Sequence, residues 1–150
     1  MIDTSKKAAS ILNDLIETCR DGQDGFLTSA EDVKDANLKA LFNRYSAQRG
    51  EFAAELQGLV AGLGQKSETT GSAAGAAHRG WINIKSAVTS RDVAAIVSEA
   101  ERGEDHAKAV YSKALQEHLP MDIRKVVQRQ YTGVLEAHDN VRRLEIQTHS

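Results

Sequence analysis

Apolar side chains recur at steps of three and four residues along several long stretches of the chain, a pattern typical of helices with one buried face. The longest of these stretches is residues 30–63. Its large apolar positions are Leu38, Leu41, Phe42, Tyr45, Phe52, Leu56, Leu59, Val60 and Leu63. No stretch of the sequence shows the sustained alternation of apolar and polar residues that is expected of strands. The pattern therefore predicts an all-α protein.

The same spacing predicts three more long helices. They cover residues 4–25, capped by Asp3 or Thr4, residues 91–118, and residues 120–146 with Pro120 in the first turn. Their expected buried positions are Ala8, Ile11, Leu12, Leu15, Ile16 and Cys19; Ile96, Ala100, Ala107, Val110, Tyr111 and Ala114; and Ile123, Val127, Tyr131, Val134 and Val141.

The connections between these helices are of two kinds. Two glycines within residues 21–25 predict a tight turn, after which Thr28 and Glu31 would form a capping box for the central helix. The break at Leu119 and Pro120 predicts a second tight connection between the last two helices. Short connections join antiparallel neighbours, so two helical hairpins are expected.

The segment between the hairpins is much longer. Residues 64–72 are polar and lack periodicity, which predicts an exposed loop, and residues 73–88 predict a shorter helix. Thr89 and Ser90 then resemble the cap of the next long helix. Residues 1–150 are thus expected to form one domain, a ferritin-like four-helix bundle with a long crossover containing a shorter helix.

The central helix carries a second stripe, made of small residues and lying about half a turn from its large apolar face. Its members are Ala36, Ala40, Asn43, Ala47, Gly50, Ala54, Gly58 and Ala61. Alanine also fills exposed helical positions, but each glycine costs about 1 kcal/mol in an exposed helix. We therefore expect a homo-oligomer, such as a dimer through Ala40, Ala47 and Ala54. Packing of the crossover on this stripe is the alternative.

Composition narrows the possible partners and compartments. The formal net charge is −2, the pI is near 6.2, and basic residues are mixed with acidic ones, so nucleic acid is not an expected partner. No apolar run reaches the length of a membrane span, and residues 1–10 lack the plan of a signal peptide. A single cysteine, Cys19, excludes an internal disulfide. These features predict a cytoplasmic protein without membrane contact.

Ferritin-like proteins with two irons carry a carboxylate on each of two helices and a Glu-x-x-His pair on each of the other two. The carboxylates available here are Glu17, Glu51, Glu101 or Glu104, and Glu136. Neither Glu51 nor Glu136 has a histidine three residues later. Helical projection also places Glu17, Glu51 and Glu136 nearly opposite the apolar faces, where carboxylates are usually solvated. An intact di-iron site is therefore not expected.

A few polar residues do fall on the apolar faces of the predicted helices. They are Gln23, Arg49 with its neighbour Gln48, Glu104, Gln130 and His138. Counting from the turns brings Arg49, Glu104 and His138 to within about two helical turns of one another, which predicts an internal polar cluster. In one interpretation, Arg49 and Glu104 form a structural ion pair and His138 is a satisfied core histidine. In the other, Glu104 and His138 bind a single metal or a small ligand.

The sequence gives little other evidence of a catalytic or binding site. The sequence contains no glycine-rich phosphate loop, no Cys-x-x-Cys pair and no serine in a nucleophile elbow, so a non-enzymatic role is favoured. Trp81 could mark a partner contact, but the more usual role of a single tryptophan is to anchor its own fold.

Three runs of sequence together resemble a known family: residues 12–22, residues 73–81 with Arg79-Gly80-Trp81, and residues 101–105. They are similar to uncharacterised bacterial ferritin-like four-helix-bundle proteins, classed as a domain of unknown function. The resemblance spans nearly the whole chain and implies a bacterial, cytosolic, stress-related protein. It brings no established activity. We therefore expect an interaction module without a cofactor, with an iron-dependent redox or storage protein as the alternative.

Overall fold

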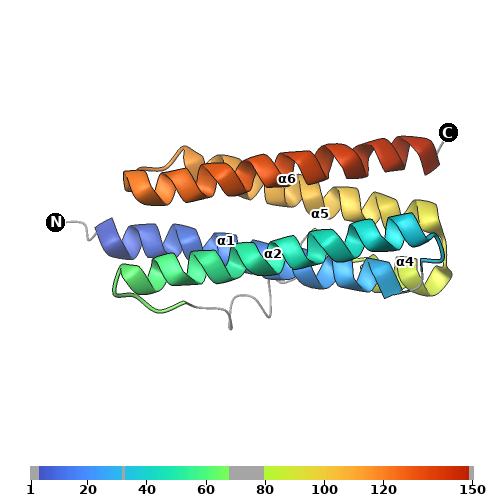
Figure 1. Cartoon of the computed structure of the whole chain (residues 1–150), viewed down its shortest axis with the longest axis horizontal. Helices are drawn as coiled ribbons and strands as arrows, with labels where there is room; N and C mark the ends of the chain where they lie inside the picture. The colour runs from blue at the N-terminus through green and yellow to red at the C-terminus, as the bar shows by residue number, and fades with distance from the viewer. Residues whose placement is uncertain (1–3, 32, 68–79, 149–150) are drawn as a thin grey trace.

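The structure, a computed structural model, describes residues 4–31, 33–67 and 80–148. These residues form the helices α1 (Thr4–Glu31), α2 (Ala36–Gly62), α4 (Ile84–Ser90), α5 (Val93–Leu115) and α6 (Met121–Thr148), and they contain no strand. The predicted all-α class is confirmed. The four long helices lie along the long axis of the molecule, and the short α4 lies at one end (Figure 1).

The first connection differs from the predicted one. Helix α1 continues through residues 21–25 to Glu31, and α2 begins after Asp35, whose side chain accepts hydrogen bonds from the backbone N–H groups of Asn37 and Leu38. The predicted turn and the Thr28 capping box were therefore wrong. Gly22 and Gly25 are buried in the middle of a helix because other side chains occupy the space where a Cβ would lie.

The second half of the chain follows the prediction more closely. Helix α5 begins after Asp92, which accepts hydrogen bonds from Ala94 and Ala95, so Asp92 rather than Thr89 or Ser90 is the cap. Pro120 immediately precedes α6. Figure 1 shows that α2 ends at the opposite end of the molecule from α4. Of the predicted 73–88 helix, residues 73–79 lie outside the described residues.

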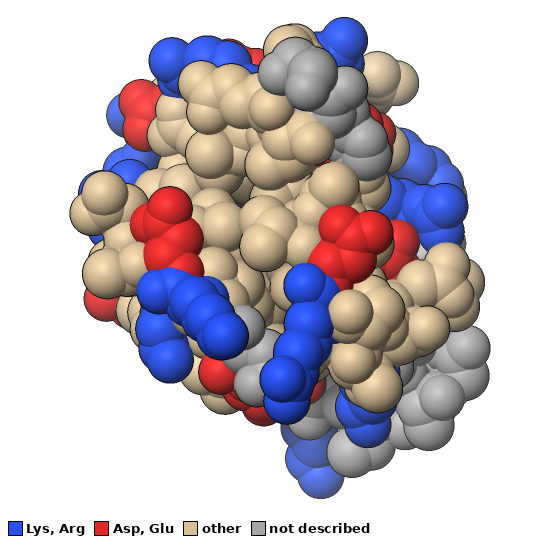
Figure 2. All heavy atoms as spheres, turned by 90° about the vertical axis from the view of Figure 1, so that its right-hand side faces the viewer, with Lys and Arg blue, Asp and Glu red and all other residues tan. Residues whose placement is uncertain are grey.

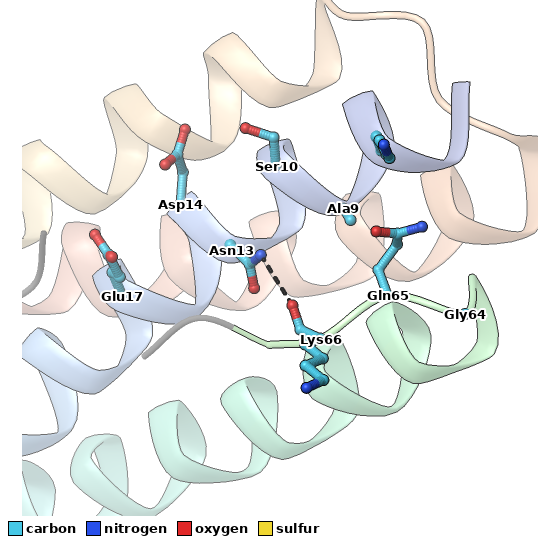
Figure 3. A pocket seen from close by; sticks show the side chains of 9 residues that line it. Ala9, Ser10, Asn13, Asp14, Glu17, Gly64, Gln65 and Lys66 are labelled. Carbon is cyan, nitrogen blue, oxygen red and sulfur yellow. Dashed lines mark hydrogen bonds between the residues drawn. The ribbon is translucent and has the colours of Figure 1, made fainter. Parts of the chain in front are cut away.

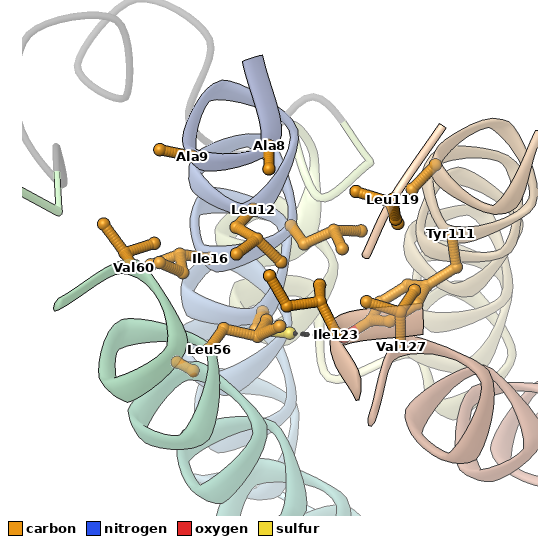
Figure 4. Packing of buried hydrophobic residues seen from close by; sticks show 14 of the residues in the cluster. Ala8, Ala9, Leu12, Ile16, Leu56, Val60, Tyr111, Leu119, Ile123 and Val127 are labelled. Carbon is orange, nitrogen blue, oxygen red and sulfur yellow. Dashed lines mark hydrogen bonds between the residues drawn. The ribbon is translucent and has the colours of Figure 1, made fainter. Parts of the chain in front are cut away.

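The buried apolar side chains form two clusters along the long axis. One cluster lies near the start of α1 and contains Leu12, Leu56 and Val127, with side chains from α1, α2, α5 and α6 converging (Figure 4). The other contains Phe26, Phe42 and Trp81. The long helices contribute to both clusters, so the periodic apolar faces recognised in the sequence are the faces that are buried.

The end of the molecule shown in Figure 2 has uncharged surface at its centre and side chains of both charge signs around it, with Lys and Arg beside Asp and Glu. Among the described residues, no helix is both long enough and apolar enough to cross a membrane.

Candidate functional site

A buried ion pair between α2 and α5 lies between the two apolar clusters. The Arg49 guanidinium donates from Nη1 and Nη2 to the two carboxylate oxygens of Glu104, each at 2.6 Å. The side chains of Arg49 and Glu104 are only 1% and 0% exposed. Both oxygens of Glu104 therefore face Arg49, a planar bidentate arrangement that suits a guanidinium and a carboxylate.

Helix α1 makes room for this ion pair. A Cβ added to Gly22 would lie 3.3 Å from Cγ and Nη1 of Arg49, so glycine allows the arginine to pass close to the α1 backbone. The guanidinium also lies 5.5 Å from the centre of the Phe26 ring, within reach of a cation–π interaction. Burial opposes the charge, but the Glu104 carboxylate and its hydrogen bonds outweigh burial and raise the pKa of Arg49 above its usual value.

A chain of polar groups continues through the neighbouring apolar cluster. Cys19 Sγ lies 3.1 Å from Tyr111 Oη, and this hydroxyl donates to Gln130 Oε1 at 2.7 Å. The Gln130 amide in turn donates to Glu55 Oε1 at 2.8 Å, and Glu55 forms an ion pair with Arg129. This chain of contacts gives each of its own buried polar groups a partner, and it leads from the thiol toward the surface.

The buried thiol predicts a loss of stability at alkaline pH. Burial raises the pKa of Cys19 from 9.0 to about 11, so the folded state favours the protonated thiol. The stabilisation is fully present below pH 9 and is lost as pH rises toward 11, by up to about 3 kcal/mol at 1.36 kcal/mol per pKa unit. Urea unfolding of wild type and Cys19→Ala between pH 8 and pH 11 would measure this loss. The free energy of unfolding should fall less with pH in the variant than in wild type, and equal falls would contradict the prediction.

His138 does not join the Arg49–Glu104 pair. It is 4% exposed, and its Nε2 lies 2.5 Å from Oδ1 of Asp105 on α5. Its Nδ1 lies 3.5 Å from Oδ1 of Asp139 and makes no hydrogen bond. Glu101, one turn before Asp105, completes a group in which one ligand atom from each of Glu101, Asp105 and His138 lies within 4.8 Å of the others.

The sequence already contained a signal for this group. Glu101 and Asp105 are four residues apart, a spacing that places both carboxylates on one face of α5. The helical projection instead selected Glu104, which points into the centre of the molecule toward Arg49. Which of these acids faces His138 depends on how α5 and α6 are rotated against each other.

The described residues do not fit a di-iron centre. Glu51 and Glu136 are exposed, as the helical projection predicts, and the Glu104 carboxylate is occupied by Arg49. Glu17 is half-buried and lines an open surface groove of about 520 Å³ between α1 and residues 64–66. In this groove the Asn13 side chain donates to the backbone carbonyl of Lys66 at 3.5 Å (Figure 3). Inward-pointing carboxylates are therefore not gathered around a common centre.

Trp81 anchors its own fold, as expected. It is 3% exposed, and its ring lies edge-on to Phe26 with the ring centres 4.9 Å apart. A Cβ on either Gly25 or Gly103 would approach the indole to 2.2 Å, so the ring occupies a slot between α1 and α5 that only two glycines leave open. Two residues after Trp81, the backbone N–H of Asn83 donates a hydrogen bond to the carboxylate of the buried Glu99.

The small-residue stripe of α2 faces outward. Ala40, Ala47 and Ala54 are exposed. Gly50 is explained within the chain, because a Cβ there would come 2.7 Å from Nε2 of Gln23 on α1. Gly58 has no such explanation among the described residues, since its Cβ position meets none of them within 4 Å.

Comparison with known proteins places the chain in a family. Residues 7–117, which cover α1 from its fourth residue and the whole of α2, α4 and α5, match the family described as a domain of unknown function (DUF2383). The chain belongs to this family. Among curated proteins, none matches the chain. Glu101 and Asp105 lie within the matched range of this DUF2383 protein, whereas His138 on α6 lies beyond it.

Proposed function

We propose that this protein is a ferritin-like four-helix bundle of the bacterial cytoplasm that acts without catalysis, by pairing with a second copy of itself through α2. The observation that carries the proposal is the outward-facing stripe around Ala40, Ala47 and Ala54. Small side chains allow two helices to approach closely. Glycine is unfavourable within a helix, and a Cβ at Gly58 would meet none of the described residues within 4 Å. The stress-related role implied by the family resemblance is part of this proposal.

The charges beside the stripe specify how two copies would pair. Ala40 and Ala54 each lie seven residues from Ala47, so an antiparallel pairing centred on Ala47 brings Ala40 of one copy opposite Ala54 of the other. Arg44 and Glu51 project on the same side of the stripe, about 40–60° from its centre, and lie about 4.5 and 6 Å from Ala47 along the axis. The same pairing therefore places Arg44 beside Glu51 of the second copy, twice by symmetry.

Charge reversal tests this register. We expect wild type to be a dimer by size-exclusion chromatography with light scattering, and Arg44→Glu or Glu51→Arg to shift the mass toward a monomer because like charges then face each other. The double variant with both reversals should recover the dimer. Ala47→Glu combined with Ala54→Glu should give a folded monomer, because both positions are exposed in the single chain.

The control is Lys125→Glu, an equal change of charge at an exposed position on α6. It should leave the mass unchanged. A wild-type protein that stays monomeric at all concentrations would refute self-association, and a double reversal that stays monomeric would refute the register.

A further inference from the structure

The buried imidazole of His138 has a carboxylate beside each of its two ring nitrogens. Nε2 faces Asp105 at 2.5 Å, and Nδ1 faces Asp139 at 3.5 Å without a hydrogen bond. The ring is 4% exposed, so it is almost removed from water. An imidazole nitrogen beside a carboxylate oxygen is a pair of donors that a metal ion can use.

A second carboxylate of α5 extends this donor set, because Glu101 lies with Asp105 and His138 in a group whose ligand atoms fall within 4.8 Å of one another. Two carboxylates and an imidazole supply three ligand atoms for one divalent ion. Arg142, whose Nη1 is 3.7 Å from Glu101, is 63% exposed and can swing into solvent when the carboxylate turns toward a cation.

We infer that Glu101, Asp105 and His138 bind one divalent transition-metal ion, with water completing its coordination. An imidazole with two carboxylate oxygens suits ions such as Zn²⁺, Mn²⁺ or Fe²⁺, rather than Ca²⁺ with its all-oxygen preference. Nε2 is the ligand atom, so the proton moves to Nδ1 and points at Asp139, the outer carboxylate that metal-bound histidines commonly have. Asp105 is 59% exposed, which leaves the ion a path from solvent.

This site differs from the centre of a di-iron bundle. It lies between α5 and α6 alone, and it uses neither Glu104 nor any carboxylate of α1 or α2. It is also independent of α2 pairing, so either proposal can fail without the other.

Zn²⁺ titration of the metal-free full chain by isothermal calorimetry tests the inference. We expect one Zn²⁺ per chain, and at least about tenfold weaker binding in Asp105→Asn and in Glu101→Gln. These two variants lie outside the buried core, so circular dichroism should show a native fold. Co²⁺ loaded into wild type should show visible absorption bands from a nitrogen-and-oxygen site, and both variants should lose them.

His118→Ala is the matched control, because His118 is an exposed histidine three residues beyond the end of α5. It should bind Zn²⁺ like wild type. Failure of wild type to bind Zn²⁺ would overturn the inference. Unchanged binding in Asp105→Asn and Glu101→Gln, or a loss confined to His118→Ala, would place the metal elsewhere and overturn the assignment.

Discussion

Replacing Arg49 by alanine is expected to lower the free energy of unfolding by about 3–5 kcal/mol, because it leaves the Glu104 carboxylate buried without a partner. Glu104 is fully buried, and both of its oxygens accept hydrogen bonds from Arg49. Helix α1 also loses the side chain that fills the space beside Gly22. Urea unfolding followed by circular dichroism at pH 7 measures the change.

Two variants separate the buried charge from lost packing. Arg49→Met combined with Glu104→Leu removes both charges while keeping apolar volume, and it should recover most of the stability. Arg129→Ala breaks the more exposed ion pair with Glu55 and should cost no more than about 1 kcal/mol. A cost for Arg49→Ala as small as that for Arg129→Ala would show that the buried pair contributes little.

Trp81→Ala is expected to lower the free energy of unfolding by about 3–5 kcal/mol, the usual range for removing a buried aromatic side chain from a core. The indole fills the slot between Gly25 and Gly103 and contacts the Phe26 ring edge-on. Its removal opens a cavity between α1 and α5 at the end of the molecule that carries α4. Thermal and urea unfolding would both report this loss.

A double-mutant cycle of Gly25→Ala and Trp81→Ala tests whether the indole and the glycine are in direct contact in the slot. Alone, Gly25→Ala should destabilise by about 1–3 kcal/mol, because its methyl group overlaps the indole. In the Trp81→Ala background the same change should be neutral or stabilising by up to about 1 kcal/mol, since alanine is the better helix former. Additive effects in the double variant would contradict direct contact between the glycine and the ring.

The apolar spacing was enough to recognise the long helices and their buried faces. Leu56 and Val127 are buried where the three-and-four pattern places them, because a long amphipathic helix has only one way to hide its apolar stripe. The same reasoning assigned Arg49 and Glu104 to the interior. Their contact, however, depends on how α2 and α5 are placed relative to each other in the folded chain, and the pattern of one helix carries no information about another.

Glycines misled the sequence interpretation for a related reason. Gly22 and Gly25 lie close together, which is typical of a helix end, so the first turn was predicted about ten residues too early. In the folded chain they are packing positions, one beside Arg49 and the other beneath Trp81. A glycine that ends a helix and one that admits a neighbouring side chain are identical in sequence, and only the neighbour distinguishes them.

The amino-acid sequence was enough to predict the helical class and the buried side of each long helix, because both follow from local periodicity. The contact of Glu104 with Arg49 and the gathering of Glu101 and Asp105 around His138 depend on how the helices pack. One residue on a helix corresponds to about 100° of rotation, so a small difference in how α5 and α6 pack decides which carboxylate meets the imidazole.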